Sequence, residues 1–138
     1  MLRAGSRLGD RYVLREVVAR GGMGEVWQAD DTVLGRVVAV KVLLPVLSGD
    51  AAFIQRFRGE ARAMAALSHP NIVEVYDFGQ AESVAYLVMQ YVPGEPLHAL
   101  LRRAGALPPA QVMTLVAQAA NALHQAHLIG IVHRDVKP

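Results

Sequence analysis

Alternation of apolar and polar residues marks most of the first 92 residues as a series of short strands. Such alternation places one side of a strand in a core and the other side toward solvent. The predicted strands are Tyr12–Ala19, Glu25–Asp30, Val37–Leu44, Ile72–Phe78 and Val84–Tyr91. Gly79–Ser83 is expected to form the turn between the last two strands.

The hydrophobic period changes to that of a helix between residues 50 and 67. Ser48 and Asp50 precede this segment as plausible N-terminal caps, and His69 with Pro70 ends it. Apolar positions recur at the spacing of a single helix face: Phe53, Ile54, Phe57, Ala61, Met64, Ala65 and Leu67. The first part of the chain is therefore predicted to follow the order βββαββ.

The second part of the chain is predicted to be helical. The cluster Val92–Pro96 lies between two structured runs, and we expect a boundary there. Leu97–Arg103 predicts a short helix, and Pro109 begins a longer one that runs to about Leu128. The chain then continues through a polar segment to Pro138.

Composition narrows the possible functions. The 138 residues include 14 Lys and Arg against 12 Asp and Glu, scattered along the chain, so no nucleic-acid-binding patch is expected. Cysteine is absent, which excludes disulfides and thiolate metal sites. His124 and His127 lie three positions apart but lack an evident third ligand, so no metal site is expected. No signal peptide or membrane-spanning segment is apparent.

A glycine cluster lies between the first two predicted strands. Gly21, Gly22, Met23 and Gly24 let the backbone approach a ligand closely and direct amide N–H groups toward an anion such as phosphate. An ordinary hairpin turn also needs glycine, and the sequence leaves that alternative open. Dinucleotide-binding and Walker loops are disfavoured, because a strand follows the glycines and no Gly-Lys-Ser or Gly-Lys-Thr is present.

Two groups of ionisable residues are candidates for chemistry. Lys41 lies within a predicted strand of mostly β-branched residues. Glu60 in the predicted helix is the best candidate for its ion-pair partner. Lys41 could instead extend to the surface, with Glu60 solvated. Asp135 and Lys137 follow His133 and could accept a proton and stabilise phosphate charge, or could belong to a polar surface turn. Lys41 and Lys137 are the only lysines in an arginine-rich chain.

Together these motifs resemble the protein kinase family, most closely bacterial Ser/Thr kinases of eukaryotic type. The glycine-rich loop pattern matches Ala19, Gly21, Gly24 and Val26, with alanine in place of the first glycine. The V-A-I-K pattern matches Val38, Ala39, Val40 and Lys41, and the start of the catalytic loop matches His133, Arg134 and Asp135. The resemblance covers nearly the whole chain and implies an α+β fold.

The resemblance implies a fold and a set of roles. We expect a kinase N-lobe over 12–92, with a five-stranded antiparallel sheet plus one helix, after a leader over 1–11. A linker over 93–96 then leads to the start of an α-helical C-lobe over 97–138. Lys41 would hold the α- and β-phosphates of ATP and pair with Glu60, Asp135 would accept the substrate proton, and Lys137 would contact the γ-phosphate. The remaining nucleotide contacts are expected from Ala19, Gly21, Gly22, Met23, Gly24, Val26, Ala39, Met89 as gatekeeper, Gln90 and Val92.

The expected function is transfer of the γ-phosphoryl group of ATP to Ser or Thr hydroxyls of proteins by the full-length parent. The family's Mg²⁺ ligands would follow Pro138, so we expect residues 1–138 alone to be inactive. The alternative is a non-catalytic, pseudokinase-like module that binds nucleotide or another kinase. We expect a cytoplasmic kinase domain. An inner-membrane anchor after residue 138 and a dimer through the N-lobe stay open.

Overall fold

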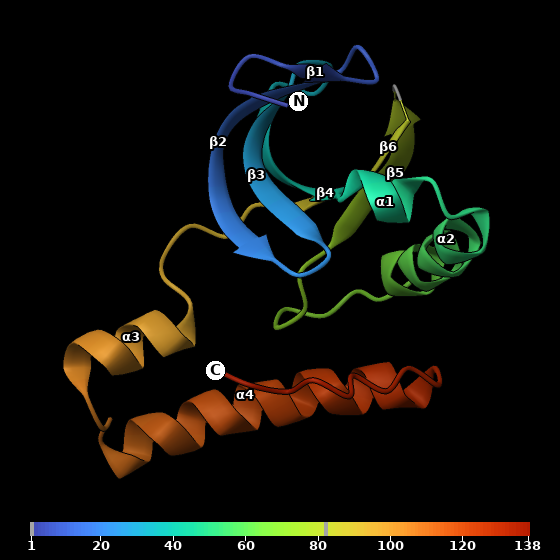
Figure 1. The fold of residues 1–138 in the computed structure, drawn as a ribbon. Helices are drawn as coiled ribbons and strands as arrows, with labels where there is room; N and C mark the ends of the chain where they lie inside the picture. Colours follow the sequence, from blue (N-terminus) through green and yellow to red (C-terminus); the bar gives the residue numbers. More distant parts are fainter. Residues whose placement is uncertain (1, 82) are drawn as a thin grey trace. The chain divides into compact units, whose positions relative to one another are not determined.

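A single antiparallel sheet is the main feature of residues 2–81 and 83–138, the part of the chain that the computed structural model describes (Figure 1). The strands are β1 (Arg7–Leu8), β2 (Tyr12–Gly21), β3 (Gly24–Asp31), β4 (Arg36–Leu43), β5 (Val75–Ala81) and β6 (Val84–Gln90). They lie in the order β1-β2-β3-β4-β6-β5, and every neighbouring pair is antiparallel. The predicted α+β class is confirmed, and the short β1 adds a strand where only a leader was expected.

One face of the sheet forms the main hydrophobic core. Alternate residues of β4, Val38, Val40 and Val42, are buried there together with Trp27 and Val88. Successive side chains of a strand point to opposite faces, so Ala39 and Lys41 lie on the other face of β4. The predicted third strand, β4, therefore has one face in the core and a second face that carries Ala39 and Lys41.

Two helices connect β4 to β5. These are α1 (Pro45–Ser48), which the sequence did not predict, and α2 (Ala51–Ala65). The Asp50 carboxylate caps α2 by accepting a hydrogen bond from the Phe53 N–H at 3.0 Å, which confirms one of the two expected caps. A second core cluster of Leu43, Ile54 and Ala85 packs α2 on the sheet face opposite the main core.

Strand β5 differs from its prediction. It begins at Val75 rather than Ile72 and continues through Gly79 to Ala81, where a turn was expected. A Cβ atom at Gly79 would lie 2.3 Å from the Tyr86 ring, so this glycine makes room for a cross-strand tyrosine instead of reversing the chain. The expected turn also includes residue 82, which lies outside the described residues.

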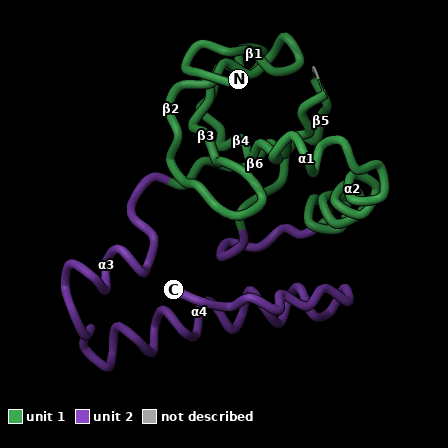
Figure 2. Tube along the Cα trace, in the orientation of Figure 1, with its two compact units in different colours: residues 1–66, 73–92 green, residues 67–72, 93–138 purple. Residues whose placement is uncertain are grey.

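The chain divides into two compact units, residues 1–66 with 73–92 and residues 67–72 with 93–138 (Figure 2). The second unit contains α3 (Leu97–Ala104) and α4 (Pro109–Leu128), close to the predicted helix bounds. Apolar side chains of α4 are exposed, among them Val112, Met113 and Val116. No helix among the described residues is both long and apolar enough to cross a membrane.

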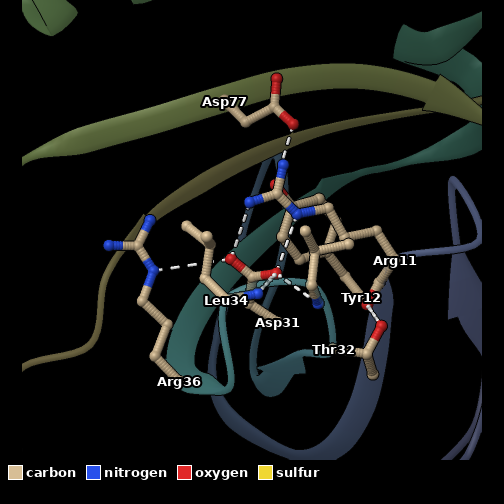
Figure 3. A network of polar contacts seen from close by, with 8 residues as sticks. Arg11, Tyr12, Asp31, Thr32, Leu34, Arg36 and Asp77 are labelled. Carbon is tan, nitrogen blue, oxygen red and sulfur yellow. Dashed lines mark hydrogen bonds and ion pairs between the residues drawn. The ribbon is translucent and has the colours of Figure 1, made fainter.

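A buried carboxylate links separate parts of the first unit (Figure 3). Asp31, at the end of β3, receives two hydrogen bonds of 2.8 Å from the Arg11 guanidinium and lies 3.5 Å from Arg36 Nε. The Val33 and Leu34 N–H groups also donate to it, which fixes the turn before β4. The hydrogen bond from Arg11 holds the pKa of Asp31 well below its usual range.

We expect Asp31→Ala to lower the free energy of unfolding by about 2–4 kcal/mol, because it leaves Arg11 and two turn amides without their acceptor. Urea denaturation at pH 7 measures this change. Asp30→Ala is the matched control, since the neighbouring carboxylate forms only a partly exposed ion pair with Arg15. Equal losses in both variants would contradict the importance assigned to the buried carboxylate.

Stability should also fall in acid through this carboxyl group. Its native pKa is depressed, so its stabilising contribution is complete above the unfolded pKa of about 3.9 and declines as pH falls below that value. Below that pH the unfolded chain binds a proton at the Asp31 carboxyl group more readily than the native chain does. Urea midpoints at pH 7, 5 and 3 should therefore decrease less steeply in Asp31→Asn than in the wild type, and parallel profiles would refute the assignment.

Candidate functional site

Strand register brings several predicted site residues onto one face of the sheet. Residues directly opposite each other in paired strands share a face and are neighbours. Ala19 lies opposite Val26, Val26 opposite Lys41, and Lys41 opposite Leu87. These residues form one row across four strands, and the row faces away from the main core.

A second row runs beside the first. Gln28 lies opposite Ala39, and Ala39 lies opposite Met89. Ala39 and Lys41 are two positions apart on β4, so both rows belong to the same face. Gln28 was not among the predicted residues, although its spacing of two from Val26 could have indicated it. The two rows combine small and apolar side chains with one cation, Lys41, and with the polar Gln28, which lies opposite Glu16 of β2. The small and apolar part suits a flat organic ring, and the cation suits anionic groups carried by that ring.

Lys41 and Glu60 are not joined in the structure. Lys41 is half-buried between buried Val40 and Val42, and Glu60 is exposed on α2. Among the described residues, neither side chain takes part in an ion pair. Because Lys41 is only partly withdrawn from water, its ammonium group does not require a carboxylate for stability. Their pairing stays a prediction.

The glycine cluster forms a tight hairpin between β2 and β3. Gly21 ends β2 opposite Gly24, the first residue of β3, and leaves Gly22 and Met23 at the tip. The Met23 carbonyl accepts a hydrogen bond of 3.0 Å from the Leu44 N–H, which ties the tip to the residue after β4. A Cβ atom at Gly24 would lie 1.9 Å from the Val42 carbonyl oxygen, so the hairpin approaches β4 as closely as a backbone allows.

The end of β6 is hydrogen-bonded to Glu74, the residue before β5. The Gln90 N–H donates to the Glu74 carbonyl at 2.8 Å, and the Gln90 side-chain oxygen accepts from the Glu74 N–H at 3.3 Å. The Gln90 N–H is therefore already engaged and cannot serve a nucleobase. Val92, two residues farther on, lies outside the strand and is 57% exposed.

The predicted catalytic loop belongs to the second unit and follows α4. Asp135 Oδ2 lies 3.1 Å from Lys137 Nζ, with both side chains about 70% exposed, so this ion pair contributes little to stability. The Asp135 N–H donates to His133 Nδ1 at 3.2 Å. Arg134 between them has a φ of +64°, an unusual backbone conformation for a residue with a side chain.

Other ionisable groups add little to the site. In the second unit, Arg103 donates to Glu95 and holds the pKa of that carboxyl below its usual value. The described residues contain no group of three or more His, Cys, Asp or Glu side chains with metal-binding geometry. The first unit therefore has one candidate surface, the sheet face with its glycine hairpin, and the second unit has another, the polar loop after α4.

Comparison with known proteins identifies the family of the chain. The family model described as "Protein kinase domain" matches residues 12–138. The chain belongs to the protein kinase family. This kinase chain is 49% identical to the serine/threonine-protein kinase PknA of Mycobacterium tuberculosis and 50% identical to PknB of Mycobacterium leprae. The first match covers 99% of the chain, and the second covers 95%.

Solved structures agree with this membership. The crystal structure of the PknI kinase domain of Mycobacterium tuberculosis matches with a TM-score of 0.83 and 34% identity. That match covers all of this chain and 56% of the PknI chain. The kinase chain also spans only 33% of PknA and 22% of PknB, so it corresponds to part of a kinase domain and a smaller part of each relative.

Gly24→Ala should distort the glycine hairpin. The added methyl group would overlap the Val42 carbonyl, so we expect a loss of about 2 kcal/mol or more in unfolding free energy. Thermal and urea denaturation measure the loss. Gly22→Ala is the control, because nothing lies within 4 Å of a Cβ atom there. Equal stability of the two variants would show that the close approach at Gly24 does not constrain the hairpin.

Proposed function

We propose that the whole protein is a Ser/Thr protein kinase, which transfers the γ-phosphoryl group of ATP to hydroxyl groups of protein substrates. The observation that carries the proposal is the pair of rows on the sheet, which aligns Ala19, Val26, Ala39, Lys41 and Met89 on one face. Family membership and the names of the relatives support the reaction.

In this proposal the sheet face binds the nucleotide. Adenine packs on the small and apolar side chains Ala19, Val26, Ala39 and Met89. The Gln90 carbonyl and the Val92 backbone provide its polar contacts, since the Gln90 N–H is engaged by Glu74. Backbone N–H groups from Gly21 to Gly24 contact the phosphates, because the hairpin lies beside the end of Lys41's strand, where Gly24 is opposite Leu43.

Charged residues then act on the phosphates and the hydroxyl group. Lys41 holds the α- and β-phosphates, and Glu60 orients it when α2 brings the two together. Asp135 accepts the proton of the substrate hydroxyl group. The hydroxyl oxygen bonds to the γ-phosphorus while the bond between that phosphorus and the β–γ bridging oxygen breaks. Lys137 leaves its ion pair with Asp135 to contact the γ-phosphate. This exchange is feasible because that pair is largely exposed.

Magnesium, when bound, would neutralise charge on the phosphates. The described residues lack a cluster of three or more candidate ligands, and we assign no magnesium ligand within them. In kinases an Asn of the catalytic loop and the D-F-G Asp hold the metal, and both positions would follow Pro138.

The domain organisation is proposed on the same basis. Residues 12–92 form the N-lobe after a leader over 1–11, and a linker over 93–96 leads into the first part of the C-lobe over 97–138. We also propose that the kinase domain is cytoplasmic, since the proposed reaction uses ATP. Anchoring of the parent to the inner membrane and dimerisation through the N-lobe are further proposals.

A non-catalytic nucleotide-binding module is the second candidate. The absence of an ion pair between Lys41 and Glu60 favours it, because catalysis by kinases uses that pair. The coding sequence beyond codon 138 distinguishes the two candidates. An open frame through the Asn and D-F-G motifs would support the enzyme, and a stop codon there would support the binding module.

Nucleotide binding is testable by thermal shift. ATP at 100 times its Kd would add about 2.7 kcal/mol to the free energy of unfolding. We expect Lys41→Ala to weaken binding at least about tenfold, which removes about 1.4 kcal/mol of this gain. The measurement compares melting with and without ATP, in the presence and absence of Mg²⁺.

Arg20→Ala provides the matched control, because Arg20 pairs with Glu25 and lies on the opposite face from its neighbour Ala19. That variant should keep the full response to ATP. A cooperative melt of the wild type without any response to ATP would rule out nucleotide binding by this chain. Equal loss in both variants would rule out a specific role for Lys41.

A further inference from the structure

Ser48, the last residue of α1, carries a buried hydroxyl group that the proposed nucleotide chemistry does not use. Among residues 2–81 and 83–138, the buried side chains of the charged or aliphatic hydroxyl type are Asp31 and Ser48. Asp31 has its role in the turn before β4. Burial of a hydroxyl group costs free energy unless the group is hydrogen-bonded, so the contacts of Ser48 indicate what it does.

The Ser48 hydroxyl group lies where strands β4 and β6 part, beside α1 (Figure 1). Toward the end of β4, the last residue pair of this ladder is Val42 with Tyr86. The next residue on β6 is Ala85, and its buried N–H donates to Ser48 Oγ at 3.1 Å. The next residue on β4 is Leu43, and its carbonyl group accepts a longer hydrogen bond of 3.5 Å from the same hydroxyl group. Ser48 thus takes the place of a further pair of the ladder.

Hydrogen bonds continue from Ser48 to the glycine hairpin. The Ser48 N–H donates to the Leu44 carbonyl at 3.0 Å, and the Leu44 N–H donates to the Met23 carbonyl at the hairpin tip, also at 3.0 Å. The Leu44 N–H and the Leu43 carbonyl belong to one peptide group. That group is therefore held by Ser48 on one side and by the hairpin tip on the other.

We propose that Ser48 is a positioning residue for the phosphate groups of the nucleotide. Its hydroxyl group fixes the peptide group at the end of β4, and this peptide group holds the glycine hairpin whose N–H groups contact the phosphates. The role rests on the proposed function. Space is open around Gly21 and Gly22, where an added Cβ atom would have nothing within 4 Å. Because glycines are conformationally free, a hydrogen bond that holds the tip reduces the entropy lost when phosphates bind.

Amide hydrogen exchange tests the attachment without any nucleotide. Ser48→Ala removes the hydroxyl group, and we expect the Leu44 N–H to exchange about fivefold faster, because one lost hydrogen bond shifts a local opening equilibrium by about that factor. The slowest amides of the sheet are the internal reference, since they report global unfolding. Unchanged exchange of Leu44 relative to that reference would overturn the proposal.

Thr32→Val is the matched control for both measurements. It removes a hydroxyl group that donates to the Arg11 carbonyl at 2.7 Å, in the turn at the opposite end of β4 from Leu44. That variant should leave the exchange of the Leu44 N–H and the nucleotide affinities unchanged.

Nucleotide affinity tests the positioning role. Calorimetric titration measures the Kd of ATP and of adenosine for the wild type, Ser48→Ala and Ser48→Thr. Ser48→Ala should weaken ATP binding about threefold or more and leave adenosine binding unchanged, because adenosine has no phosphates for the hairpin to contact. A merely structural role would weaken both ligands alike. Ser48→Thr keeps the hydroxyl group and should keep the wild-type ratio of the two affinities.

The two measurements distinguish failure of this role from failure of the proposed function. A wild type that binds neither ligand would overturn the function and the positioning role together, while faster Leu44 exchange in Ser48→Ala would still show the attachment. Equal weakening of ATP and adenosine in Ser48→Ala would overturn the positioning role alone. An equal loss of ATP affinity in Ser48→Thr or in Thr32→Val would also overturn it, since the hydroxyl group of Ser48 would then not be the cause.

Discussion

The register of β4 is the constraint on which the rest of this chain depends. Its valines fill the main core, and its intervening residues, Ala39 and Lys41, form the opposite surface. A shift of one residue would bury the Lys41 ammonium among Trp27 and Val88 and expose the valines. The hydrophobic effect therefore fixes which side of the strand can do chemistry. Neighbouring strands inherit the same division through their pairing.

The buried Asp31 complements this register from the strand ends. It joins the turn before β4 to Arg11, which immediately precedes β2, and Tyr12 continues the link to Asp77 in β5. These contacts connect residues up to 65 positions apart in sequence. The edge strand β5 and the ends of the internal strands β2 and β3 are thus linked by hydrogen bonds to carboxylates.

The sequence predicts the strands and helices well where periodicity determines them. The β4 run, the amphipathic α2 with its Asp50 cap, and the two later helices follow from local patterns. Strand β1 is too short for any periodic signal, and Gly79 resembled a turn because its contact with Tyr86 is not local. The Asp31 network escaped prediction for the same reason. The site residues predicted on the sheet come from motifs, but their common face depends on strand register.

The hydrogen bond between the Leu44 N–H and the Met23 carbonyl has a consequence beyond the hairpin. Leu44 is also the residue from which α1 begins, and α1 leads directly into α2. The hairpin tip and the entrance to the helical segment are therefore joined by a single backbone hydrogen bond. The glycine hairpin is thus connected to the helix that carries Glu60 through backbone atoms alone, without any side chain as an intermediary.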